Sequence, residues 1–150
     1  MKILNPICFT IFLLSFFNCS AIAQSKDQTF VGIIKDGNPI LEVDQEKMLS
    51  TYNENLLKIS GIDAKFNSIN IVNSLDNQYF LIFKGNEYTS SFVVTSIEFK
   101  LFALNTISCT TSECASEAFG CTPKLNGVQC YPCNNKGKCT KTVSSGSLID

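Results

Sequence analysis

The sequence contains no histidine, tryptophan or arginine, so all twelve of its basic residues are lysines. Without histidine, Ser-His and Cys-His nucleophilic pairs are excluded, as are histidine-ligated zinc and haem sites. Without arginine, the bidentate guanidinium contact that recognises phosphates and carboxylates is excluded too. Catalysis would have to use carboxylates, lysine, tyrosine or thiols. We therefore predict a protein that is not an enzyme, with no catalytic residue, no metal site and no cofactor.

A strong excess of charge of either sign is also missing. The formal net charge is −1 at pH 7 for the whole chain. Residues 24–150 alone contain eleven lysines against thirteen acidic residues, a net charge of −2. No basic face is expected from these numbers, so nucleic acid and anionic membranes are not expected as partners.

Carboxylates occur in two local groups. Glu42, Asp44 and Glu46 lie at the predicted start of a helix, and Glu113 and Glu117 are four residues apart among the cysteines. Paired acids can cleave glycosides when a cleft holds them about 5–10 Å apart. A small domain without tryptophan has little room for such a cleft. We interpret the first group as helix capping and the second as a solvated acidic pair.

The first 23 residues have the three-part layout of a secretory signal peptide. Lys2 gives a basic start, residues 7–17 are apolar, and Ala21-Ile22-Ala23 is a small-x-small cleavage site. The apolar stretch is about half of the ~20 residues that a bilayer requires, so we predict cleavage and not a membrane anchor. Lipidation at Cys19 is an alternative that the large residues before it disfavour. No later segment has transmembrane character, so we expect a secreted, periplasmic or cell-surface protein.

Residues 24–108 have the periodicities of an α+β domain with the order β-β-α-β-β-β. Apolar runs on both sides of Asp36-Gly37-Asn38-Pro39 predict a hairpin, and a period of two after residue 63 predicts three more strands. Short turns join these strands, so we expect an antiparallel meander with the helix on one face and solvent on the other. The predicted strands are 30–34, 40–43, 64–75, 78–84 and 91–104.

A helix is predicted from Gln45 to Ser60. Asp44 is a suitable N-cap, and Gly61 tolerates the left-handed conformation that ends helices. The predicted apolar stripe of the helix consists of Met48, Leu49, Tyr52, Leu56 and Ile59. In the last predicted strand, one face consists of Val93, Thr95, Ile97, Phe99, Leu101 and Ala103, and the opposite face of Ser96, Glu98 and Lys100.

Cysteines are concentrated near the end of the chain. Six lie between Cys109 and Cys139 with the spacing C-x4-C-x6-C-x8-C-x2-C-x5-C, and residues 24–108 contain none. This stretch is rich in glycine and proline and poor in apolar residues, so burial alone cannot offset the entropy of ordering it. We predict a tail, residues 109–150, held by three disulfides in one of fifteen possible pairings. The cysteines are Cys109, Cys114, Cys121, Cys130, Cys133 and Cys139.

Two other uses of these thiols are possible in principle. Four of them could hold zinc, with Cys130 and Cys133 as a C-x2-C knuckle, although structural zinc sites usually have two knuckles or histidines. Cys130-Tyr131-Pro132-Cys133 also has the C-x-P-C form of thioredoxin-like redox sites. Those sites lie at the N-terminus of a helix, whereas a turn-forming sequence follows Cys133 here. We therefore favour structural disulfides.

The tail either only covers the sheet or presents a binding loop, which we place at Lys124, Leu125, Asn126, Val128 and Tyr131. The favoured function is a secreted or envelope-associated, non-enzymatic accessory or binding protein, whose partner is a protein, or a glycan, of the envelope or extracellular space. A small thiol-redox or cysteine-ligated metal-binding protein is the alternative. An inhibitor of an exported enzyme is a further one.

Both ends of the chain resemble a known group of proteins. Ala21-Ile22-Ala23-Gln24, the lysine- and asparagine-rich composition, and the segment Gln129-Cys130-Tyr131-Pro132-Cys133…Gly137-Lys138-Cys139 are similar to uncharacterised small cysteine-rich secreted proteins of Bacteroidota. The resemblance covers the signal peptide and the last forty residues. It implies an exported, envelope-associated or extracellular bacterial protein, and it assigns no functional residue.

Overall fold

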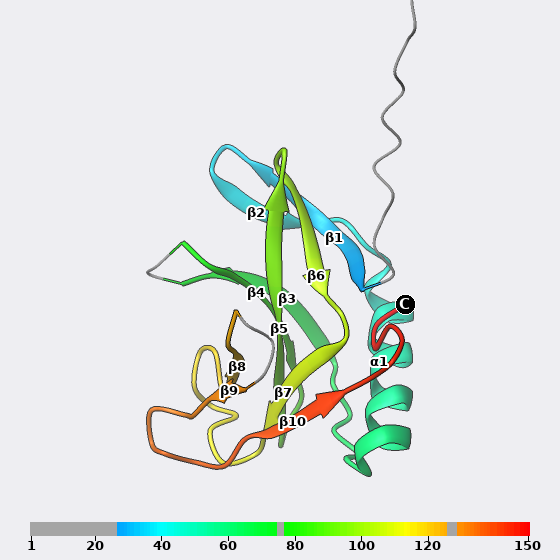
Figure 1. Ribbon diagram of the computed structural model, residues 1–150, viewed down its shortest axis with the longest axis vertical. Helices are drawn as coiled ribbons and strands as arrows, with labels where there is room; N and C mark the ends of the chain where they lie inside the picture. The colour runs from blue at the N-terminus through cyan, green and yellow to red at the C-terminus, as the bar shows by residue number, and fades with distance from the viewer. Residues whose placement is uncertain (1–26, 75–76, 126–128) are drawn as a thin grey trace, which may run out of the picture.

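The computed structural model describes residues 27–74, 77–125 and 129–150 (Figure 1). The predicted signal peptide, the alternative lipidation site Cys19, and Asn126 and Val128 of the predicted binding loop lie outside the described residues. Within the described ranges, no helix combines the length and apolar character needed to cross a membrane.

An antiparallel sheet of eight strands forms most of the described structure. A separate two-stranded ladder of β8 (Thr122–Pro123) and β9 (Cys130–Tyr131) lies in the cysteine-rich region. The strands of the large sheet are β1 (Gln28–Lys35), β2 (Asn38–Leu41), β3 (Ser68–Asn73), β4 (Tyr79–Lys84), β5 (Thr89–Ile97), β6 (Lys100–Leu104), β7 (Ile107–Thr111) and β10 (Thr140–Val143).

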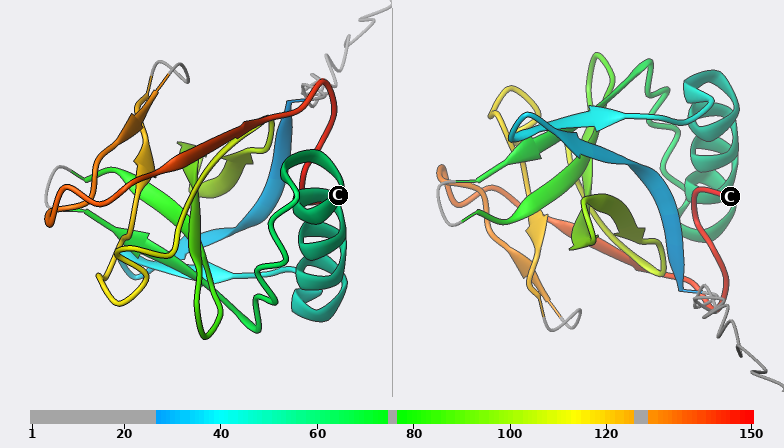
Figure 2. Two further views of the ribbon diagram at one scale, coloured as in Figure 1. Left: turned by 90° about the horizontal axis from the view of Figure 1, so that it is seen from below. Right: turned by 90° about the horizontal axis from the view of Figure 1, so that it is seen from above.

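The long strand β5 organises the large sheet. One edge of β5 pairs with β4 from Thr89 to Val94. The other edge is shared, because Thr89–Ser91 pair with β7 and Val94–Ile97 pair with β6. Since β6 continues outward to β1 and β2 while β7 continues to β10, the sheet divides at this edge and curls into a near-barrel (Figure 2).

The helix α1 (Gln45–Ser60) has the boundaries that the sequence predicts. The carboxylate of Asp44 accepts a hydrogen bond of 3.0 Å from the backbone N–H of Lys47, and Gly61 ends the helix with a φ of 74°. The fully buried side chains are Met48, Tyr52 and Leu56. These three residues are spaced four apart, and Ser60 is the next position in the same row. Ile59 lies outside this row and is 46% exposed, so the predicted apolar stripe is wrong at that position.

The core lies between α1 and the concave side of the curled sheet. Its centre is aromatic: the ring of Tyr52 stacks on Phe66 with centroids 5.4 Å apart, and lies 4.6 Å from Phe83 and 5.0 Å from Phe92. Leu148 and Ile149 complete this core and are 0% and 2% exposed. No strand or helix pattern marks these two positions in the sequence, so they were not predicted as core residues.

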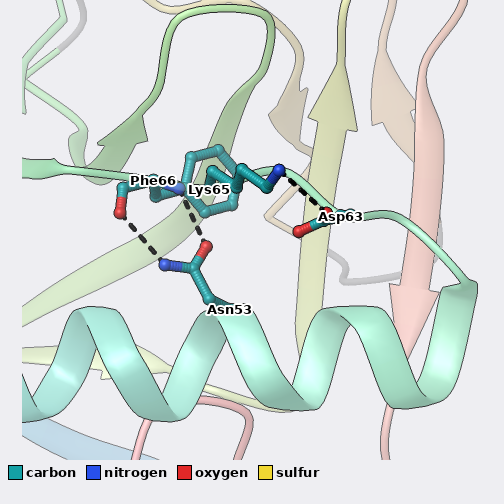
Figure 3. Close-up of polar contacts among 4 residues, drawn as sticks. All are labelled: Asn53, Asp63, Lys65 and Phe66. Carbon is teal, nitrogen blue, oxygen red and sulfur yellow. Dashed lines mark hydrogen bonds and ion pairs between the residues drawn. The ribbon is translucent and has the colours of Figure 1, made fainter.

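The link from α1 to β3 is held by one amide side chain (Figure 3). Asn53 Nδ2 donates to the carbonyl of Phe66 at 3.0 Å, and Asn53 Oδ1 accepts from the N–H of Phe66 at 2.8 Å. The amide thereby replaces a strand partner for Phe66. Lys65, next to it, has a φ of 51° and forms an exposed ion pair of 3.3 Å with Asp63.

The predicted fold class is confirmed as an antiparallel sheet with one helix and a disulfide-rich C-terminal region. The predicted sandwich and its β-β-α-β-β-β order are wrong in detail. Instead of covering a flat meander, α1 lies along the open side of a near-barrel, and eight described strands follow it. Four of these, β7 to β10, lie wholly or partly in residues 109–150, for which the sequence predicted no strand.

The single strand predicted for residues 91–104 is two strands, β5 and β6. They are joined by Glu98 and Phe99, whose φ values are 49° and 67°. Such two-residue turns usually contain asparagine, aspartate or glycine, so this turn was not recognisable. The predicted apolar face is therefore wrong: Phe99 is 73% exposed, and Val93 lies in a different apolar cluster from Leu101.

The meander prediction required a fully solvated outer face of the sheet. Part of this face is buried instead. Phe80, Ile82 and Val93 form a second buried cluster there. Phe119 from the cysteine-rich region packs on this cluster, with its ring edge-on to that of Phe80 and the centroids 6.3 Å apart. The cysteine-rich region thus covers part of the sheet.

Candidate binding groove in the cysteine-rich region

All six cysteines after residue 108 form disulfides, and each bond joins a cysteine to the third one after it. The bonds are Cys109–Cys130, Cys114–Cys133 and Cys121–Cys139, with Cα–Cα distances of 5.9, 6.0 and 5.9 Å. Three interleaved disulfides restrict this short segment strongly. Each disulfide contributes about 2–4 kcal/mol to the free energy of unfolding. The region is therefore a firm support for the side chains on its surface.

The C-x2-C sequence of Cys130 and Cys133 does not form a bond of its own, because the two residues belong to different disulfides. Cys130 lies in β9 and no helix follows Cys133, whereas thioredoxin-like sites place the reactive thiol at a helix N-terminus. Cys130 and Cys133 therefore lack the arrangement of a thioredoxin-like site.

Glu113 is exposed and Glu117 is half-buried, and both carboxylates also bind backbone donors, which the sequence did not predict. The carboxylate of Glu117 accepts hydrogen bonds from the N–H groups of Asn134 and Asn135 at 3.2 and 3.3 Å. Glu113 Oε2 accepts from the N–H of Lys138 at 2.9 Å. The two acids thus fix the turn between Cys133 and Cys139, because they satisfy backbone donors that have no strand partner.

The described residues of the predicted binding loop, Lys124, Leu125 and Tyr131, lie in or beside the β8–β9 ladder. In this ladder, Thr122 pairs with Tyr131 and Pro123 pairs with Cys130. The Lys124 ammonium donates to Gln129 Oε1 at 2.9 Å and lies 5.2 Å from the centre of the Tyr131 ring, a distance that favours a cation–π contact. These contacts hold the base of the loop in one conformation.

A groove of about 610 Å³ lies between this ladder and the β3–β4 side of the sheet. We call it the tail groove. Leu125 and Tyr131, which are 65% and 51% exposed, line it from the ladder, and Phe119 and Pro132 add further apolar surface from the cysteine-rich region. Its sheet side is formed by Ser74, Gln78 and Phe80.

Polar groups on the sheet side of the tail groove are fixed in place. Gln78 Nε2 donates to the carbonyls of Tyr79 at 3.1 Å and Val94 at 3.0 Å, and Ser74 Oγ accepts from the N–H of Gln78 at 3.2 Å. The groove therefore combines aromatic and aliphatic walls with a few oriented polar groups, which is the usual composition of a binding site.

A buried hydroxyl cluster lies on the other side of the sheet, away from the tail groove. The Tyr52 hydroxyl is 2.6 Å from Ser90 Oγ, which is 2.8 Å from Thr110 Oγ1 and donates to the carbonyl of Cys109 at 3.2 Å. Burial raises the pKa of Tyr52 above its usual 10.0, and hydrogen bonds from neighbouring hydroxyls offset only part of the rise. The fully buried phenol therefore stays neutral and structural.

Of the predicted loop, the structure brings Leu125 and Tyr131 to the tail groove and uses Lys124 to support it. Sequence reasoning missed Phe80 and Phe119, which lie on its other walls. Phe119 is the only phenylalanine after residue 108, and this isolation among small and polar residues was an available signal. Phe80 carried no such signal, because it belongs to an ordinary apolar strand.

Comparisons with known proteins give no match to a family model, a curated protein or a solved structure.

Proposed function

We propose that this protein is an exported, non-enzymatic binding protein that holds a partner protein of the cell envelope or extracellular space in the tail groove. The observation that carries the proposal is the exposure of Leu125 and Tyr131 on a cross-linked ladder that forms one wall of this groove. Exposed apolar side chains that gather on one surface, as Leu125 and Tyr131 do on the wall of this groove, often mark an interaction site.

The disulfides and the start of the sequence support the exported location. Three disulfides persist in oxidising compartments and are rare in the cytosol. The predicted signal peptide in residues 1–23 supports the same location. An exported protein shares its compartment with envelope and extracellular proteins, so we propose its partner among these.

The chemistry of the partner follows from the walls of the groove. Tyr131 is of a residue type that often contributes most of the energy in protein interfaces, and Leu125 adds aliphatic surface beside it. The fixed amide of Gln78 adds polar specificity. We therefore expect a protein segment that inserts an apolar side chain between Phe119 and Tyr131.

Crosslinking capture from an envelope fraction, followed by titration of the identified partner in a calorimeter, tests the proposal. Y131A and L125E should each weaken the affinity about tenfold or more. I59E is the matched control, because Ile59 is comparably exposed at 46% but lies on α1, and it should change the affinity less than about twofold.

Protease treatment of the envelope fraction separates the two classes of partner. Capture should disappear after the treatment if the partner is a protein, and a protease-resistant ligand would instead indicate a glycan. Equal affinities for wild type, Y131A and L125E would refute the assignment of the tail groove, whatever the partner is.

A further inference from the structure

Four sulfur atoms from two different disulfides lie side by side inside the cysteine-rich region. The Sγ atoms of Cys114, Cys121 and Cys133 are buried and lie within 4.8 Å of one another. Cys121 Sγ is 3.8 Å from Cys133 Sγ, and Cys139 Sγ is 4.0 Å from Cys133 Sγ. We call these four residues the sulfur cluster.

The distances between the two disulfides match those of a thiolate metal site. Four thiolates at about 2.3 Å from a tetrahedral zinc ion lie about 3.8 Å from one another. The contacts of Cys133 with Cys121 and Cys139 already have this length. Reduction would let the sulfurs within each disulfide move apart to a similar separation, and the bound cation would then replace the two disulfides as the cross-link that orders the region.

The geometry points to a second, reduced state of the tail, in which the sulfur cluster binds one thiolate-preferring divalent cation of the zinc class. Each disulfide is reduced by one dithiol, which gives two electrons and two protons and leaves as a disulfide. Cation binding then releases four protons from the four cysteine thiols. The inference goes beyond the proposed binding function and does not depend on it.

Residues around the sulfur cluster suit this state. Thr111 Oγ1 lies 3.6 Å from Cys114 Sγ and 3.7 Å from Cys133 Sγ, and it is held by the N–H groups of Glu113 and Cys114. The Thr111 hydroxyl donates its one proton to the carbonyl of Lys138 at 2.8 Å, and rotation of this hydroxyl in the reduced state would let it donate to a thiolate instead, as groups around metal ligands commonly do. Burial of three of the four sulfurs keeps competing water away.

The ligand set differs from the one that the sequence suggested. The C-x2-C knuckle would have used Cys130 and Cys133 together. In the structure Cys130 is bonded to Cys109, and neither belongs to the group of three buried sulfurs within 4.8 Å. The disulfide Cys109–Cys130 packs in the same apolar cluster but contributes no sulfur to this group of three, so it provides an internal control.

Cadmium titration of the full chain without its signal peptide tests the inference. After reduction with a phosphine and in the absence of oxygen, wild type should bind one equivalent with the ultraviolet band of cadmium thiolates, and cadmium-113 NMR should report four sulfur ligands. The oxidised protein should not bind. Zinc should displace the cadmium from the reduced protein.

Matched variants decide whether the site is the sulfur cluster. C109S/C130S should keep the four-sulfur signal and its affinity, whereas C114S/C133S and C121S/C139S should each lose about a hundredfold or more. All three variants lose the same number of thiols, so non-specific binding to an unfolded tail would weaken all of them equally. That outcome, or a wild-type NMR signal of fewer than four sulfurs, would overturn the inference.

Discussion

The Thr29 hydroxyl donates a hydrogen bond of 2.7 Å to the carboxylate of Asp150, 121 positions later in the chain. Asn105, which is fully buried where β6 passes into β7, donates from its amide to the same hydroxyl and to Ser147 Oγ at 3.0 Å. Three distant segments thus meet at one small polar junction beside the core.

Loss of this junction should destabilise the fold. T29V leaves the buried Asn105 amide without one acceptor and should lower the free energy of unfolding by about 1–3 kcal/mol, and D150A should lower it by about 1 kcal/mol. The double variant should lose less than the sum, because both changes remove the same bond. Urea denaturation measures all three, with S145A as an exposed control. Additive losses would show that the bond contributes nothing.

The amide of Asn53 should matter more than the ion pair drawn beside it in Figure 3. N53A leaves both backbone groups of Phe66 without partners, so the free energy of unfolding should fall by about 1–3 kcal/mol. D63N removes an ion pair whose side chains are 80% and 59% exposed, so it should change stability by less than about 0.5 kcal/mol. Similar losses in chemical denaturation would contradict this ranking.

Stability should decrease in alkaline solution because of Tyr52. Its pKa is raised above 10.0 in the folded state by burial, so the unfolded state loses the phenolic proton first. The stabilisation is complete below pH 10.0 and is lost as the pH rises above that value. Y52F should flatten this part of the stability profile, whereas Y131F should not. Identical profiles for Y52F and wild type would refute the assignment.

Substitutions in the turn between β5 and β6 should increase the stability of the fold. Glu98 and Phe99 both have positive φ, which costs a residue with a Cβ about 1–2 kcal/mol relative to glycine. E98N/F99G supplies the preferred pair for such turns and should raise the free energy of unfolding by about 1 kcal/mol or more. E98A/F99A, which keeps the Cβ atoms, should give no such gain. A melting temperature unchanged by E98N/F99G would contradict the turn geometry.

Local signals in the sequence were sufficient for α1 and for the first hairpin. Asp44, Gly61 and the apolar row of the helix act within a few residues of one another, and the Asp36-Gly37 turn has φ values of 51° and 79° that suit its residues. The β5–β6 turn was missed for the opposite reason, because surrounding strands impose a conformation that Glu98 and Phe99 do not favour. Tertiary pairing outweighed local preference there.

The tail groove required contacts that no local pattern contains. Tyr131 and Leu125 were predicted as binding residues from their place among turn-forming residues, and they remain predictions. The opposite wall depends on Phe119 packing on Phe80, 39 residues earlier in the chain. Only the complete fold brings these two rings together.

The register of β7 with β10 has a consequence for how the chain acquires its bonds. Cys109 pairs with Lys141 across these strands, and β10 begins directly after Cys139. When β7 and β10 pair before the sulfurs are oxidised, their pairing closes the cysteine-containing loop, and fewer of the fifteen disulfide pairings then stay within reach. In that order, the paired strands act as a template. Oxidation after sheet assembly should give native disulfides, and oxidation before it should give scrambled pairings.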